Sequence, residues 1–261
     1  VVDLANYVML TLGHPMHTFD FDKLPTKKIN IGYSSSKKEL CTLDSIDRKL
    51  SSKNLLIKDG DTPIAIAGVI GGKNTEIDKK TKNIFIESAL FDPIVIRKSA
   101  KSLDLSTDAS RRYERSVDSE MVKIAIELLS GLIIKYAGGT ACKGIVQSGQ
   151  EPKNNNEIIF NLDDCNRFLG TSLNKEEIES VLDKVNIKYS KSKESYLCVA
   201  PSYRCHDVQR EVDIYEEVAR VVGFNNIKNS EKFSIDYRVI NNNSFNLIDL
   251  IKNAISSNGF I

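Results

Sequence analysis

Two of the three histidines lie three residues apart near the start of the chain, with a proline between them. His14 and His17 flank Pro15 in this motif, and Asn6 lies a short distance upstream. Imidazole nitrogens are common metal ligands, so this spacing is compatible with a metal pair. No third ligand is within obvious reach, and the alternative is a turn in which both histidines are hydrogen-bonded parts of the structure.

Glu87 lies within an apolar run, residues 84–91, whose pattern predicts a β-strand. Side chains alternate between the two faces of a strand, so Glu87 shares a face with Phe85 and Ala89. If that face is buried, the carboxylate needs a partner, because an unpaired buried charge is strongly destabilising. Two alternatives stay open: an edge strand with Glu87 in water, or the floor of a pocket that binds a polar group of a ligand.

Three carboxylates share one face of a predicted helix in the last third of the chain. Asp213, Glu216 and Glu217 are spaced i, i+3 and i+4, and Asp207 lies six residues before the first of them. Oxygen ligands of this kind suit Mg²⁺, which binds few carboxylates directly and keeps several waters. The alternative is a solvated face whose carboxylates pair with nearby arginines. Those arginines are Arg204, Arg210 and Arg220.

Short strands and one long helix are predicted for the first part of the chain, which carries the histidines and Glu87. Helical periodicity begins after Ser119, which can serve as the N-cap, and Gly138 ends the helix. Apolar runs bounded by glycine, proline, aspartate and asparagine predict buried strands. These runs span residues 55–57, 64–70, 84–91 and 94–96.

A polar, asparagine-rich stretch at residues 148–156 predicts a linker to a second unit. The elements predicted for that unit are a strand at 157–162, a helix with the capping box Asn174 and Glu177, a strand at 196–200 and a helix at 208–222. Residues 241–243 mark another boundary, and an amphipathic segment starts at 247–261. We therefore expect a two-domain α+β protein.

The balance of charges excludes a protein that coats nucleic acid through a broadly basic surface. Lysine and arginine number 36 against 35 aspartate and glutamate, so the formal net charge is +1. The five cysteines are scattered without a Cys-x-x-Cys pair, which favours reduced thiols in the cytosol. No run approaches the ~18 apolar residues of a membrane span. The chain starts without methionine and stops in mid-pattern, so we expect a piece of a longer polypeptide.

A set of short motifs runs through the whole chain. In the first part the motifs lie at residues 1–10, 13–20, 67–72, 87–89, 107–111 and 113–118. In the second part they lie at residues 166–170, 201–204 and 213–224. Together and in this order, they closely resemble the beta subunit of bacterial phenylalanyl-tRNA synthetase.

The resemblance implies an α+β fold in which residues 1–148 form a multi-layer β-sheet editing domain. Residues 155–228 would form a small winged-helix-like α/β module, and 229–261 the truncated start of a catalytic-like domain. The family's editing domain hydrolyses tyrosine wrongly attached to phenylalanine tRNA. A second site is needed because an apolar synthetic pocket rejects an added hydroxyl by only ~10²-fold. The alternative function is a scaffold and RNA-positioning fragment with no editing activity.

By the same resemblance, Glu87 would accept the hydroxyl group of the misattached tyrosine. His17 and Asn6 would lie at the ester end, near the attacking water and the terminal adenosine of the tRNA. No strong nucleophile is implied, so positioning of water is the expected mechanism. Further residues that match the family's pocket are Pro15, Gly68, Gly71, Thr107 and Ala109.

The resemblance also implies a Mg²⁺ site shared with the alpha subunit. Two residues separate Arg204 from Asp207 here, where the family has one. The expected partners are the alpha subunit, in an alpha2/beta2 heterotetramer, and tRNA(Phe), in the cytoplasm and away from membranes. ATP would be used by the full enzyme and not by this fragment. The residues that match the Mg²⁺ site are Asp207, Asp213, Glu216 and Glu217.

Overall fold

The computed structural model describes residues 1–34, 39–149, 157–192, 195–228 and 243–259, which form two units with separate cores and one further helix. The helices of the first unit are α1 (Val2–Leu12), α2 (Pro93–Ser102), α3 (Asp108–Tyr113) and α4 (Met121–Ala137), with short 3-10 helices at Phe21–Lys23 and Lys73–Thr75. Its strands are β1 (Met16–Asp20), β2 (Ile29–Tyr33), β3 (Glu39–Cys41), β4 (Asp47–Lys49), β5 (Leu55–Asp59), β6 (Thr62–Ile66), β7 (Ile70–Gly71) and β8 (Ile84–Ser88).

All strand pairs of the first unit are antiparallel. The largest sheet has the order β2-β5-β6-β7, while β3 pairs with β4 and β1 pairs with β8. The two-stranded ribbon of β1 and β8 packs against the larger sheet through the buried side chains of Phe19, Ile57 and Ile64. Its register places His17 opposite Glu87, so two segments far apart in the sequence meet at one point.

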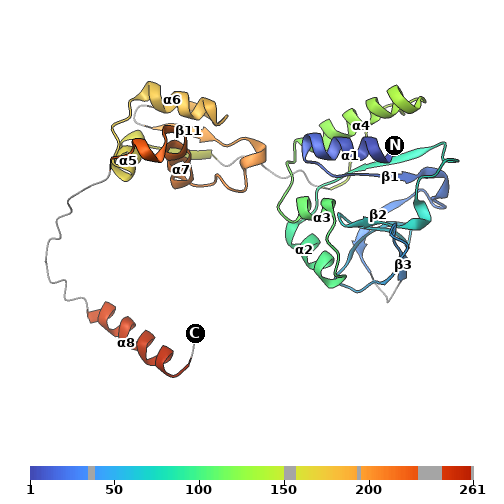
Figure 1. Ribbon diagram of the computed structural model, residues 1–261, viewed down its shortest axis with the longest axis horizontal. Helices are drawn as coiled ribbons and strands as arrows, with labels where there is room; N and C mark the ends of the chain where they lie inside the picture. Colours follow the sequence, from blue (N-terminus) through green and yellow to red (C-terminus); the bar gives the residue numbers. More distant parts are fainter. Residues whose placement is uncertain (35–38, 150–156, 193–194, 229–242, 260–261) are drawn as a thin grey trace.

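Helices α1 and α4 lie side by side on the first unit (Figure 1). Their contact is a small apolar cluster that includes Val8 and Leu129, with Met16 and Ile86 of the ribbon packed against it. Helix α2 and Tyr113 of α3 pack against the larger sheet in another cluster. Helices, ribbon and sheet therefore form successive layers, and the expectation of an α+β fold with a multi-layer β-sheet is confirmed.

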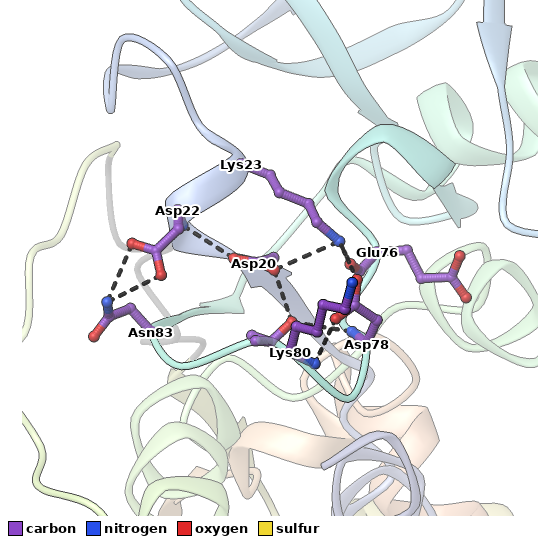
Figure 2. Close-up of polar contacts among 8 residues, drawn as sticks. Asp20, Asp22, Lys23, Glu76, Asp78, Lys80 and Asn83 are labelled. Atoms are coloured by element: carbon purple, nitrogen blue, oxygen red, sulfur yellow. Dashed lines mark hydrogen bonds and ion pairs between the residues drawn. The ribbon is translucent and has the colours of Figure 1, made fainter.

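A polar network closes the ribbon at the end where β1 finishes and β8 begins (Figure 2). Asp20, which is buried, accepts hydrogen bonds from the backbone N–H of Asp22 and from the hydroxyl of Thr81. Lys23 donates to the Asp78 carboxylate at 2.9 Å, and Asn83 donates to Asp22. These bonds fix the loop before β8 onto the end of β1, which supports the register of the pair.

Two predictions of local structure in the first unit are wrong. Residues 94–96 belong to α2, because Asp92 accepts hydrogen bonds from two backbone N–H groups and Pro93 takes the first helical position. The predicted helix after Ser119 exists, but it begins at Met121 with Glu120 at the N-cap and no side-chain cap. The pattern also left α1 and α3 unpredicted.

The second unit is smaller and has a three-stranded sheet in the order β10-β11-β9. Its elements are β9 (Glu157–Phe160), α5 (Leu162–Leu169), α6 (Lys175–Lys184), β10 (Lys188–Lys191), β11 (Tyr196–Val199) and α7 (Glu211–Val222), with 3-10 helices at Ser202–Arg204 and Phe224–Asn226. The capping box of Asn174 and Glu177 is confirmed at the start of α6. Helix α7 begins three residues later than the predicted start at 208.

The remaining described helix is α8 (Asn243–Ser257), which carries exposed apolar side chains such as Leu250. Most of the predicted linker, residues 150–156, lies outside the described residues, as do residues 241–242 of the predicted second boundary. Among the described residues, no helix is both long enough and apolar enough to cross a membrane.

Candidate functional site

A small cavity lies where the ribbon, the larger sheet and α3 meet. Its volume is about 60 Å³. The predicted site residues that line this cavity are Pro15, His17, Gly68, Gly71, Glu87 and Ala109. Most of the rest of its wall is apolar, and the other residues that line it are Met16, Ile57, Ala65, Ile66, Val69, Ile70 and Tyr113. We call it the Glu87 cavity.

Glu87 places a carboxyl group in this apolar surrounding. Burial raises the pKa of Glu87 to about 8, so the carboxyl is mostly protonated at neutral pH. Among the described residues, no side chain makes a hydrogen bond or ion pair with it. Of the two alternatives from the sequence, the structure therefore favours a pocket with a polar group in its wall over an edge strand in open water.

His17 faces Glu87 across the ribbon and is also kept neutral. Burial lowers the pKa of His17 to about 4, and its ring meets Phe19 edge-on at 4.5 Å between centroids. A Cβ atom at Gly71 would fall 2.5 Å from the imidazole Nε2, so only glycine lets the backbone of β7 approach the ring this closely. Gly71 therefore fixes the place of His17 in the cavity wall.

His14 has a structural environment that differs from that of His17. It is buried, and its Nε2 lies 3.1 Å from the Ser88 hydroxyl, which itself donates to the Val122 carbonyl at 2.6 Å. Because that hydroxyl proton goes to Val122, the imidazole must donate from Nε2. Within the described part of the chain no three potential metal ligands gather. His14 thus fits the structural alternative from the sequence rather than a metal pair.

Thr107 and Asn6 lie outside the cavity wall. The Thr107 hydroxyl donates to the Val69 carbonyl at 2.8 Å and accepts from the Ser110 N–H, so it caps α3 and ties it to a cavity residue. Asn6 is exposed on α1. The structure therefore does not bring either residue into direct contact with the space beside Glu87.

Tyr113 is a cavity residue to which the sequence analysis assigned no role. It is buried on α3, four residues after Ala109, and therefore on the same helix face. Its spacing from Ala109 was the sequence signal that could have identified Tyr113 as a cavity residue. The positive φ of Gly68, at +65°, turns the chain where a Cβ atom would meet the side chains of Tyr113 and Phe91 at 3.0 Å.

The acidic residues of the second unit are largely paired with arginine. Glu217 is buried and forms ion pairs with Arg204 and Arg220, and hydrogen bonding from Arg204 lowers the pKa of Glu217. Asp213 accepts from Arg210, which lowers the pKa of Asp213, and it also caps the start of α7.

The remaining two members of the predicted Mg²⁺ set do not complete a site. Asp207 pairs with Arg204 at 2.7 Å, and Glu216 is exposed. No three of the carboxylates that the structure describes lie close enough together to hold a metal ion. As arranged within this chain, the donors do not fit Mg²⁺. Most of them instead form ion pairs with arginines, which was the alternative from the sequence.

Comparisons with known proteins cover both units. The family model described as "B3/4 domain" matches residues 1–138, and the model described as "tRNA synthetase B5 domain" matches residues 158–224. A phenylalanine–tRNA ligase beta subunit from Carboxydothermus hydrogenoformans is 37% identical over 253 residues, or 92% of this chain and 32% of that protein. One from Fusobacterium nucleatum is 41% identical over 229 residues, 87% of this chain and 28% of that protein.

The chain belongs to the phenylalanine–tRNA ligase beta-subunit family. It spans about a third of the length of these relatives. Within this family assignment, the Glu87 cavity lies in the B3/4 domain and the arginine-paired carboxylates lie in the B5 domain. A solved N-terminal fragment of the beta subunit from Pyrococcus horikoshii aligns over 85% of this chain and 65% of that one, at 19% identity and a TM-score of 0.45. That likeness is too low to add to the assignment.

Proposed function

We propose that the B3/4 domain of this beta-subunit chain hydrolyses tyrosine misattached to tRNA(Phe), with the side chain of tyrosine bound in the Glu87 cavity. The supporting observation is a mostly protonated carboxyl that has no partner among the described residues and stands in an apolar wall. A tyrosine hydroxyl would satisfy this group, whereas phenylalanine would leave it without a partner. Sites that bind a hydroxyl in this way reject the analogue without it by up to ~10⁴-fold or more.

The chemistry assigned to the cavity is attack by water on the ester. No serine, threonine, cysteine or lysine is among the described residues that line it, so no side-chain nucleophile is assigned. Because the pKa of His17 is about 4, its imidazole is a weak base at neutral pH. We therefore assign His17 the role of orienting the attacking water by a hydrogen bond. The water oxygen bonds to the ester carbonyl carbon, the bond to the ribose oxygen breaks, and that oxygen takes up the proton that the water releases.

The roles of Thr107 and Asn6 change in this proposal. Thr107 acts on the cavity indirectly, through the position of α3 and of the Val69 carbonyl. Asn6 stays a predicted contact of the ester end, and that role requires the terminal adenosine of the tRNA to extend to the exposed face of α1.

The test is release of tyrosine from Tyr-tRNA(Phe) by an intact ligase that carries this chain, compared with its Glu87→Ala and Glu87→Gln variants. Glu87→Ala removes the hydroxyl's partner and should slow tyrosine release at least tenfold relative to release of phenylalanine. Glu87→Gln keeps a neutral acceptor of similar shape and should retain more of this preference. No tyrosine release by the intact ligase, despite normal attachment of phenylalanine, would favour the scaffold alternative.

Assembly with the alpha subunit, binding of tRNA(Phe) and use of ATP by the whole ligase are proposed from the family alone. The donors within this chain do not themselves fit Mg²⁺. A site shared with the alpha subunit therefore stays a prediction of the family resemblance, at Asp207, Asp213, Glu216 and Glu217. Glu216 is the exposed member of that set. Weaker association with the alpha subunit in Glu216→Ala, and unchanged association in the α6 control Glu176→Ala, would support an intersubunit role.

A further inference from the structure

The backbone pairing of β1 with β8 stops at the end of the ribbon beside the Glu87 cavity. Its last backbone pair is Met16 with Ser88, and the next pair in the same register would be Pro15 with Ala89. Proline has no N–H group, so this next pair cannot form the usual exchange of hydrogen bonds across the ladder. The Ala89 carbonyl therefore lacks the donor that the N–H of residue 15 would otherwise supply.

The hydroxyl of Tyr113 supplies that donor. It lies 3.2 Å from the Pro15 carbonyl and 3.2 Å from the Ala89 carbonyl, so its single proton is shared between the two and bridges the strands where the backbone bond is missing. Burial, with a further contribution from the charge of Glu87, raises the pKa of Tyr113 well above its usual value, so the hydroxyl keeps its proton.

The ring of Tyr113 is held as firmly as its hydroxyl. It meets Phe91 edge-on with 5.1 Å between centroids, and it packs where a side chain at Gly68 would not fit. A buried ring in a fixed position gives its hydroxyl a fixed position as well. The separation of the two strands at Pro15 and Ala89 is therefore determined by a side chain from α3.

We propose that Tyr113 is a positioning residue, which sets the separation of β1 and β8 beside the cavity and so aligns Glu87 with the bound side chain. Glu87 and Ala89 lie two residues apart on the same strand face, as do His17 and Pro15. A shift at the Pro15–Ala89 position is thus transmitted along both strands to the pair that faces the ligand. This inference rests on the proposed editing function.

The test uses Tyr113→Phe in the intact ligase, because this change removes the hydroxyl and keeps the ring. The rates of tyrosine release from Tyr-tRNA(Phe) and of phenylalanine release from Phe-tRNA(Phe) are measured, together with the unfolding temperature. We expect the Tyr-to-Phe ratio to fall about tenfold, less than the ~10²-fold of a 1 Å displacement. Tyr136→Phe, at an exposed tyrosine of α4, is the matched control and should leave the ratio unchanged.

A merely structural role gives a different pattern, because general loosening slows both reactions in the same proportion. Adding Tyr113→Phe to Glu87→Ala should change the ratio no further, because Tyr113 acts only through the contact of Glu87 with the tyrosine hydroxyl, which Glu87→Ala has already removed. An unchanged ratio in Tyr113→Phe, or full additivity with Glu87→Ala, overturns the inference. Failure of the unmodified ligase to release tyrosine instead overturns the proposed function.

A second variant covers the case in which Tyr113→Phe does not fold. Incorporation of 3-fluorotyrosine at position 113 keeps the hydroxyl and the ring but changes the acidity of the donor. The more acidic hydroxyl forms stronger hydrogen bonds to the two carbonyls and draws the strands closer, so the Tyr-to-Phe ratio should shift by about twofold, whereas 3-fluorotyrosine at position 136 should leave it unchanged. An unaltered ratio with fluorotyrosine at 113 counts against the positioning role.

Discussion

At position 87, one carboxyl group couples stability to function. An apolar wall raises its pKa, and the same wall leaves it without a partner among the described residues. A carboxyl group in such a wall lowers the stability of the fold when it ionises. Groups of this kind are common at functional sites, where they bind a polar group of a ligand. Gly71 contributes in the opposite way, because the absence of a side chain lets the backbone contact His17.

The pH dependence of unfolding should reveal the burial of Glu87. Its pKa is about 8 in the folded chain against an ordinary 4.5, so the folded state holds the proton more tightly. This contribution to stability is complete below pH 4.5 and is lost as the pH rises towards 8, by at most ~1.4 kcal/mol per pH unit. Glu87→Gln should flatten this dependence between pH 6.5 and 8.5 in urea unfolding.

The pH range in that experiment separates Glu87 from the histidines. Burial lowers the pKa values of His14 and His17 to about 4, so their contributions to stability are lost as the pH falls from 6.5 towards 4. Above about pH 7.5 both histidines are neutral in the folded and unfolded states, and between pH 6.5 and 7.5 their effect is the same in the parent chain and in Glu87→Gln. An equal slope in the parent chain and in Glu87→Gln would show that Glu87 ionises normally.

At the scale of elements, short α3 positions the cavity. Its six residues include Ala109 and Tyr113, which line the cavity, and its N-cap Thr107 also binds the Val69 carbonyl. A helix this short has little intrinsic stability, so its cap and its packing define its position. The ribbon is similarly held at both ends, by the Asp20 network at one and by Tyr113 at the other.

Substitution of the α3 cap should therefore affect both stability and editing. Thr107→Ala removes the side-chain cap and should cost ~1–2 kcal/mol of unfolding free energy. Thr107→Ser keeps the hydroxyl and should retain most of the stability, which makes it the matched control. Urea unfolding gives the cost, and tyrosine release from Tyr-tRNA(Phe) should slow in the alanine variant alone. Equal stability of the two variants would contradict the capping role.

At the scale of the whole chain, the B3/4 and B5 domains have separate cores. The core around Phe160, Leu182 and Ile214 contains residues of the second unit alone, and the cores around Phe19 and Ile96 contain residues of the first. A hydrogen bond joins the two units, from the Ser202 hydroxyl to the Asp118 carboxylate at 3.0 Å. Such an arrangement favours largely independent unfolding of the two domains.

Leu182→Ala should test this independence. The side chain is fully buried in the second core, and its truncation should cost ~2–5 kcal/mol. Calorimetry should show one transition moved to lower temperature and another unchanged. The reciprocal variant, Leu129→Ala in the first unit, should move the other transition. A single transition that shifts in both variants would show that the domains unfold together.

Local sequence was sufficient for elements whose signals lie within a few residues. The capping box of Asn174 and Glu177 and the helical period after Ser119 each involve one segment, and the motifs identified the family. The prediction failed at residues 94–96, where three β-branched residues suggest a strand. Asp92 and Pro93 supply a helix start there, and α2 packs its Ile96 side chain against the larger sheet.

The tertiary structure decided what depends on distant segments. The register that places His17 opposite Glu87, the placement of Tyr113 between Pro15 and Ala89, and the ion pair of Glu217 with Arg204 each join residues from separate segments. Residue type by itself does not determine a pKa or a partner, because both depend on burial and on the charges nearby. The sequence determined the family and the kind of chemistry available, whereas packing decided which of the candidate residues meet in one cavity.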